Sequence, residues 1–98
     1  MTYASITVAE ALTIEDYWAV DAQLGPDRAD GLISEAAGCA AGGLHVITVW
    51  ESQAHHERFI AERLVPAFEA AGVRPGPLTF TNLDLDALYV NAGVSVDR

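Results

Sequence analysis

The sequence contains no lysine, one cysteine and no long apolar run, and each of these absences excludes a class of function. Five basic residues, all of them arginine, stand against fourteen acidic ones, and the formal net charge is −9. A protein of this charge repels phosphate backbones and anionic lipids, so we expect neither a nucleic-acid nor a membrane partner. Cys39, in a Gly/Ala-rich turn without an activating base, permits no internal disulfide, no cysteine-based zinc cluster and no catalytic thiol.

Sequence motifs for cofactors and for secretion are missing as well. The sequence has no G-x-G-x-x-G, Walker, H-E-x-x-H or G-x-S-x-G motif, so nucleotide cofactors, zinc hydrolysis and serine esterase chemistry have no support. We therefore expect no metal and no cofactor. The first residues lack a basic segment followed by an apolar one, and no later stretch approaches about 18 uninterrupted apolar residues, which together predict a cytoplasmic protein.

What is present is the patterning of one small α+β domain. The 98 residues, 51% of them hydrophobic, suffice for one core and one cleft. Period-two alternation predicts strands, and helical spacing after the capping residues Thr13 and Ser52 predicts two helices. Gly25-Pro26 should end the first helix, and Pro66 should kink or break the second. The expected strands span 3–10, 31–37, 44–50 and 78–83, and the expected helices run from Thr13 to Gly25 and over 53–71.

This order of elements predicts a ferredoxin-like βαββαβ fold, with a four-stranded antiparallel sheet and two helices on one face. The domain covers residues 1–83, and 84–98 form a C-terminal arm or tail, with a short helix in that segment as the alternative. Segment 44–50 is apolar on both of its faces. A strand of this kind is covered on both sides, whereas two helices cover only one. We therefore expect a second copy of the chain on the other face, in a homodimer packed sheet to sheet.

Several segments of the chain together resemble a known group of proteins. They are Gly31-Leu-Ile, the turn with Gly38 and Gly42-Gly43, Val46-Ile-Thr-Val-Trp-Glu-Ser52 and Phe59-x3-Arg63-Leu-x-Pro66. Over residues 3–83 the chain resembles the dimeric α/β-barrel superfamily, and within it the small actinobacterial-type proteins related to antibiotic-biosynthesis monooxygenases. The resemblance implies that two protomers form a barrel and that each keeps a pocket between its helices and its sheet.

Several chemistries are implied by the same resemblance. They are cofactor-independent oxygenation, lactone isomerisation, polyketide cyclisation, haem degradation and chlorite breakdown. One fold supports all of them, so the resemblance does not choose among them. Relatives often carry His where Glu35 stands and Asp where Thr48 stands, and most of the residues that haem-degrading members use have no counterpart here. We do not expect haem.

The candidate catalytic residues are His56 and Glu35. His56 shares a helix face with Phe59, so its imidazole should point inward and could act as a general base near neutral pH. His55 points about 100° away from it, so the two cannot chelate one metal from one regular helix. Glu35 lies on a strand and could exchange protons if it is directed into a partly apolar pocket. The structural alternatives are a hydrogen-bonded core histidine and an exposed or ion-paired carboxylate.

Five side chains are candidates for contact with a substrate. Trp50, at the end of the central strand, could stack on a planar molecule and offer its indole N–H, and Phe59 would add an apolar wall. Tyr17 or Trp18 must face the sheet, and a tyrosine hydroxyl there could orient a ligand carbonyl. Asn82 shares a strand face with apolar residues and therefore needs partners, a ligand among them. Core packing is the alternative for each of the aromatic residues.

His45 and Arg63 are weaker candidates. His45 alternates with Trp50 on the same strand and lies on the opposite face, so the two should not share a site. Arg63 could anchor an anionic substrate or form an ion pair with Glu57, with Glu62 or with a carboxylate across the dimer, and the ion pair is favoured.

Two classes of function follow from these residues. The first is a small homodimeric enzyme that acts on a hydrophobic, aromatic or polyketide-like molecule by cofactor-independent oxygenation, isomerisation or cyclisation. The second is a non-catalytic protein of the same fold that binds a small molecule or serves as an assembly module. A pocket holding both Trp50 and a titratable group favours the enzyme, whereas a pocket with purely apolar walls favours binding alone.

Overall fold

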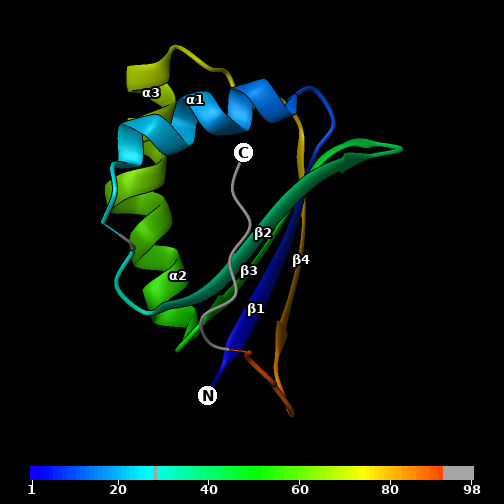
Figure 1. Cartoon of the computed structure of the whole chain (residues 1–98), viewed down its shortest axis with the longest axis vertical. Coiled ribbons are helices and arrows are strands. Elements are labelled where there is room, and N and C mark those ends of the chain that lie inside the picture. The colour runs from blue at the N-terminus through cyan, green and yellow to red at the C-terminus, as the bar shows by residue number, and fades with distance from the viewer. Residues whose placement is uncertain (28, 92–98) are drawn as a thin grey trace.

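The computed structural model describes residues 1–27 and 29–91. Its sheet has the strand order β2-β3-β1-β4, and every neighbouring pair is antiparallel. Figure 1 shows the helices together on one side of this sheet. The ferredoxin-like βαββαβ prediction is therefore confirmed. In chain order the elements are β1 (Tyr3–Ala9), α1 (Ile14–Leu24), β2 (Leu32–Ala40), β3 (Gly43–Trp50), α2 (Gln53–Phe59), a π-helical turn (Ile60–Leu64), α3 (Val65–Ala71) and β4 (Leu78–Asp84).

Both predicted helix starts are confirmed by their caps. At the start of α1, Thr13 Oγ1 accepts a hydrogen bond from the Asp16 backbone N–H, and the Asp16 carboxylate accepts one from the Thr13 backbone N–H. Ser52 Oγ accepts from the His55 backbone N–H at the start of α2. These side chains satisfy backbone donors that have no partner within the helix, which is why the chain turns into a helix at these two places.

The disturbance expected at Pro66 takes the form of a π-helical turn between α2 and α3. Proline has no N–H to donate, and its ring collides with the carbonyl four residues earlier in a regular α-helix. Here the Val65 N–H donates to the Ile60 carbonyl, five residues earlier, and the backbone angles stay right-handed helical at Ile60, Leu64 and Val65. The wider turn accommodates the proline without ending the helical path.

Two boundaries differ from the sequence-based expectation. Strand β2 continues past residue 37 to Ala40, because Gly38 and Cys39 pair with His45 and Leu44 of β3. Cys39 therefore lies in a strand, and its predicted place in the turn is wrong. The short helix considered after residue 84 is absent from residues 85–91, and residues 92–98 lie outside the described part of the chain. The Leu85 N–H donates to the Thr2 carbonyl, which holds the start of the arm beside β1.

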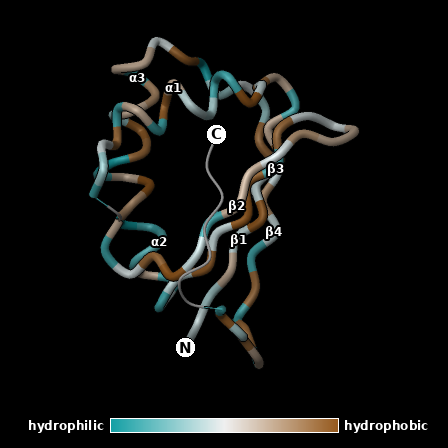
Figure 2. The backbone as a smooth tube through the Cα atoms, in the orientation of Figure 1, coloured by the Kyte–Doolittle hydropathy of each residue, from teal (hydrophilic) through white to brown (hydrophobic). Residues whose placement is uncertain are grey.

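The two faces of the sheet differ in what covers them. Side chains that alternate toward the helices include Trp50 and Leu44 of β3, whereas Ile6 of β1 and Ile47 and Val49 of β3 point to the opposite face. Ile47 is 45% exposed there. Figure 2 shows hydrophobic residues along the central strands, and Figure 1 shows the helices on one side of the sheet. No helix in the described ranges is long and apolar enough to cross a membrane.

The core under the helices consists of two clusters rather than one. Tyr3, Ala29 and Trp50 form the cluster at one end of the β1–β3 pair. Ala9, Leu12 and Leu44 form the other, and the pairing of Tyr3 with Trp50 and of Ala9 with Leu44 places them at opposite ends of the two strands. A cavity lies along this face of the sheet.

Candidate functional site

A cavity of about 200 Å³ lies between the helices and the sheet. Most of its walls are apolar, and α1, the π-helical turn, α3 and all four strands contribute to them. Its polar and titratable lining comes from a few side chains, namely Thr7, Asp16, Tyr17, Asp21, Glu35, Thr48 and His56. An apolar cavity with a small number of placed polar groups has the composition of a small-molecule site.

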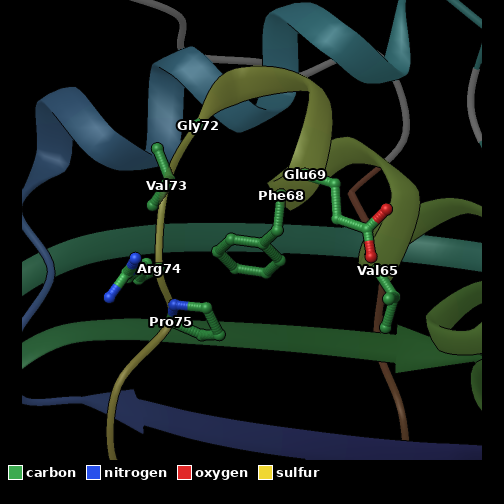
Figure 3. Close-up of a pocket in the computed structure, with 7 residues that line it drawn as sticks. All are labelled: Val65, Phe68, Glu69, Gly72, Val73, Arg74 and Pro75. Carbon is green, nitrogen blue, oxygen red and sulfur yellow. The ribbon is translucent and has the colours of Figure 1, made fainter.

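A second, more open hollow of about 540 Å³ adjoins the cavity at the end of α3 (Figure 3). The two share Val65, Phe68 and Pro75 in their walls. In Figure 3 the Phe68 ring lies beside Pro75, with Glu69 and Arg74 on opposite sides of it. Since these charged groups lie at the rim of an exposed surface, we take the enclosed cavity, and not the open hollow, as the candidate site.

Glu35 and Tyr17 meet in the wall of the cavity. The Tyr17 hydroxyl, from α1, donates a hydrogen bond to Glu35 Oε2, from β2, and both residues line the cavity. One of Tyr17 and Trp18 was predicted to face the sheet, and this contact shows that Tyr17 does so. A carboxylate accepts more than one hydrogen bond, so Glu35 can hold Tyr17 and still receive a proton or a donor from a ligand. The hydrogen bond therefore holds the Glu35 carboxylate in one orientation in the cavity wall.

An aromatic cluster forms another part of the wall, where β3 passes into α2. The Trp50 ring centroid lies 5.3 Å from the His56 ring and 5.2 Å from the Phe59 ring. Trp50 is 1% exposed, and its Nε1–H meets no hydrogen-bond acceptor among the described residues. A buried donor without an acceptor is costly, and one beside a cavity can be satisfied by a ligand.

His56 is buried in this cluster, as predicted from its place on the helix. It is 7% exposed, and the Tyr3 ring lies 5.8 Å from its own. Burial lowers the pKa of His56, and the nearby Glu57 carboxylate offsets only part of this effect. The imidazole is therefore neutral at pH 7, which is the state in which it can accept a proton.

The lowered pKa of His56 predicts an acid-sensitive fold. The unfolded chain binds a proton at His56 as the pH falls below the ordinary value of 6.5, whereas the folded chain resists it, so stability is lost in this window. We expect the free energy of unfolding to fall less between pH 7 and pH 5 in His56→Gln than in the wild type. Urea titrations at the two pH values measure this. His45→Gln, on the opposite face of the sheet, is the matched control, and an equal pH response in the wild type and His56→Gln would contradict the prediction.

Trp18 and Asn82, two of the predicted substrate contacts, do not line the cavity. Trp18 packs edge-on against Tyr17, with ring centroids 5.2 Å apart. Asn82 is exposed, and its Oδ1 accepts a hydrogen bond of 2.7 Å from Ser5 Oγ, which supplies the partner that its strand position required. His45 lies on the opposite face from Trp50, as alternation predicted, and its Nδ1 is 2.9 Å from the Gly43 carbonyl.

His55 and Arg63 hold the helices in place instead of contacting the cavity. His55 Nδ1 is 2.7 Å from Ser52 Oγ, and its Nε2 is 3.9 Å from an Asp30 carboxylate oxygen. The ion pair of Arg63 with Glu57 or Glu62 is wrong within the described residues, because its Nη2 donates to the backbone carbonyls of Leu24 and Asp27. A pair with a carboxylate across the dimer stays a prediction. These carbonyls lie at the end of α1, where acceptors lack helical partners and attract a cation.

Asp16 and Asp21 of α1 are lining residues that the sequence analysis did not single out. The spacing contained part of the information, because Asp21 follows Tyr17 by four residues and so lies on the same helix face. Asp16 could not have been found in this way, since its role in the capping box already explained it.

Comparison with known proteins gives structural likeness and no sequence match. No protein-family model and no curated protein matches the chain. A putative antibiotic biosynthesis monooxygenase from Chloroflexus aurantiacus J-10-fl is similar in structure, with a TM-score of 0.67, 12% identity and coverage of 92% of this chain and 98% of that one. A protein of unknown function from Nitrosomonas europaea, NE2512, is similar with a TM-score of 0.65, 14% identity and coverage of 94% and 95%.

A ligand complex is among the similar structures. It is a monooxygenase from the ActVA-Orf6 gene of Streptomyces coelicolor bound to nanaomycin D, with a TM-score of 0.58, 16% identity and coverage of 93% of this chain and 92% of that one. Identity at this level bears on the fold and leaves the activity open. The chain shares its ferredoxin-like fold with these antibiotic biosynthesis monooxygenase structures, which confirms the fold that the resemblance in its sequence predicted.

Proposed function

We propose that the cavity binds a hydrophobic aromatic or polyketide-like molecule and that Glu35 moves a proton on it, in a cofactor-independent oxygenation, isomerisation or cyclisation. The observation that carries this proposal is the Glu35–Tyr17 pair in the wall of an otherwise mostly apolar cavity that also contains Trp50. A fixed base in a site that excludes water is the minimum machinery for removing a proton from a phenol or from a carbon next to a carbonyl.

Each residue has a separate task in this scheme. Glu35 accepts the substrate proton, and Tyr17 orients the carboxylate through its hydrogen bond. Trp50 and Phe59 provide flat apolar surface for a ring. His56 is a second acceptor for a proton, because burial lowers its pKa and leaves the imidazole neutral. Its ring lies beside the Trp50 ring.

The same proton removal serves the three reactions. In oxygenation, the anion left on an anthrone-type substrate transfers electrons to O₂; one oxygen atom becomes the new carbonyl, and the other leaves as water with the two hydrogens of the CH₂ group. In isomerisation, the proton returns to a different carbon of the same anion. In cyclisation, the anion attacks a carbonyl carbon of the same molecule. Shape and one base suffice for each, which is consistent with the wall composition.

Turnover by matched variants tests the proposal. Hydroxylated naphthalenes, anthrones and unsaturated lactones are supplied with the wild type, Glu35→Gln, His56→Gln and the exposed control Glu62→Gln, and O₂ uptake and product formation are followed. We expect Glu35→Gln to lower kcat/KM by about 10²- to 10⁴-fold and Glu62→Gln to leave it unchanged. Equal turnover by all four proteins would remove the proposed bases, and binding without turnover by the wild type would favour the non-catalytic alternative.

The proposal includes a homodimer. Ile6 and Ile47 give an apolar surface to the face of the sheet opposite the helices, and Ile47 is 45% exposed in the single chain. Apolar surface of this kind is removed from water most economically by an identical surface related by a two-fold axis. Sedimentation velocity at micromolar concentration should give the mass of two chains, and a single well-behaved protomer would contradict this part of the proposal.

A further inference from the structure

We infer that Phe68 sets the size limit of the ligand, because its side chain separates the cavity from the open hollow at the end of α3. The inference rests on the proposed function only for the location of the site, and it adds a residue that determines specificity. Three observations carry it, which are the wall that the two spaces share, the bonds that hold Phe68 in place, and the side on which the cavity meets water.

The cavity and the hollow adjoin at a wall to which Phe68 contributes the largest side chain. Of the described residues, the two spaces share Phe68, Val65 and Pro75. The rest of the hollow is formed by described residues that do not line the cavity, namely Glu69, Gly72, Val73 and Arg74. Figure 3 shows the Phe68 ring beside Pro75. A side chain that borders both of two adjoining spaces forms the partition between them, and here the partition is an aromatic ring.

The end of α3 holds this ring in place. The Val73 N–H donates to the Phe68 carbonyl at 3.1 Å, and the Gly72 N–H donates to the Glu69 carbonyl at 3.2 Å. With the left-handed angles of Gly72, whose φ is 69°, these two bonds form a Schellman motif, in which the residue after the glycine packs on the last turn of the helix. Phe68 and Val73 accordingly pack against the same core cluster, the one that contains Leu44. The ring therefore has a fixed place in the wall.

The cavity meets water between α3 and β4. Val65, Leu78 and Phe80 line it and are 48%, 37% and 49% exposed. A ligand too long for the cavity would extend into water here, where further carbons bury no apolar surface and add no affinity. The hollow beyond Phe68 offers an apolar wall instead, to which Val73 contributes. Phe68 therefore determines the length up to which a ligand gains affinity, because it keeps longer ligands out of the hollow.

Linear primary alcohols from 1-butanol to 1-decanol measure this limit. The cavity of about 200 Å³ is moderately larger than the engineered cavity of about 150 Å³ that holds benzene, so the shorter alcohols suit it and the longer ones exceed it. The probes are uncharged because the charges differ between the two spaces. The cavity is lined by the carboxylates of Asp16, Asp21 and Glu35, and the hollow by Glu69 and Arg74. A charged probe would therefore report on these groups as well as on length.

Titrations followed in ¹H–¹³C NMR spectra of the methyl groups show how tightly each alcohol binds and which space its chain enters. Val20 lines the cavity and not the hollow, whereas Val73 lines the hollow and not the cavity. In the wild type we expect the affinity to rise about fourfold per methylene and then to level off within the series. The Val20 resonances should shift with every alcohol that binds, and those of Val73 should not. No turnover is needed, so a failed activity assay leaves the test intact.

In Phe68→Ala we expect the affinity to keep rising for about two or more carbons beyond the wild-type limit, because the removed ring opens the hollow to the chain. The Val73 resonances should shift with these longer alcohols. Phe59→Ala is the matched control, since Phe59 lines the cavity and not the hollow. It removes the same atoms and enlarges the cavity, so it should lengthen the limit without shifting the Val73 resonances. If circular dichroism shows that Phe68→Ala does not fold, Phe68→Leu and Phe59→Leu test the same difference.

Four outcomes would overturn the inference. They are an affinity of the wild type that keeps rising through 1-decanol, the same limit in the wild type and the Phe68 variant, a longer limit in that variant without a shift of Val73, and no binding of any alcohol up to its solubility. If no alcohol binds while anthrones or lactones are turned over with dependence on Glu35, the proposed function survives and the size limit is wrong. If the expected limits appear without turnover of any substrate, the role of Phe68 stands and the catalytic proposal fails.

Discussion

Replacing Trp50 by alanine should lower the free energy of unfolding by about 3–5 kcal/mol, the range for large aromatic residues removed from a core. Trp50 is 1% exposed and joins Tyr3 and Ala29 in one of the two core clusters, with Phe59 packed against it. The cavity next to it makes the loss greater, because the space vacated by the indole joins a hollow that the neighbouring side chains already fail to fill. Denaturant unfolding followed by circular dichroism measures the effect.

Trp50→Phe is the informative companion to this variant. Phenylalanine keeps most of the apolar contact and removes the N–H that meets no acceptor among the described residues. Removing a buried unsatisfied donor is worth about 1–3 kcal/mol, which offsets the smaller ring, so we expect a net change within about 1 kcal/mol of the wild type. A loss as large as that of Trp50→Ala would show that the indole N–H is bonded in solution. A loss below about 1 kcal/mol for Trp50→Ala itself would contradict its place in the core.

The fold was predictable because its information is local. Three elements are each determined by a local pattern: β1 by alternation in 3–9, α1 by the cap at Thr13 and β3 by the apolar segment 44–50. The order of the elements then leaves few ways to arrange them. The extension of β2 from Gly38 to Ala40 was not predictable, since Gly38 and Ala40 have poor strand propensity and the segment is held by pairing with β3. An interruption of the α-helix near Pro66 was predictable, because proline cannot donate the helical hydrogen bond. Its form, a π-helical turn, was not predictable, because tertiary packing decides it.

The direction of a side chain in the candidate site was predictable where the period of its own helix or strand sets it. Contacts between side chains of two different elements were not predictable. The inward position of His56 and the separation of His45 from Trp50 follow from periods of 3.6 and 2. The contact between Tyr17 and Glu35 depends on how α1 crosses the sheet, which no pattern within either segment contains. Arg63 shows the same limit, because its carbonyl acceptors lie 39 and 36 residues away in the chain.

Gly43→Ala should cost substantially more stability than Gly42→Ala, although the two glycines are adjacent and both have left-handed backbone angles. Their φ values are 110° and 96°, so alanine is strained at either position, by about 1–2 kcal/mol. A Cβ on Gly42 meets nothing within 4 Å, whereas one on Gly43 would lie 2.5 Å from the Ala9 carbonyl oxygen and 2.6 Å from Glu10 Cα. Those atoms belong to the backbone where β1 ends, so no side chain can rotate out of the way.

The close approach at Gly43 also supports the second core cluster, because Ala9 and Leu44 pair directly across β1 and β3. Separating the strands there would loosen both of these buried residues, which also line the cavity. We expect Gly43→Ala to lose at least about 2 kcal/mol more than Gly42→Ala, within the range of single substitutions that clash with backbone. Urea titrations of the two variants measure the difference with the φ strain common to both. If the two variants lose equal free energy of unfolding, the end of β1 moves aside at little cost. The pairing of β1 with β3 then does not determine the shape of this end of the cavity.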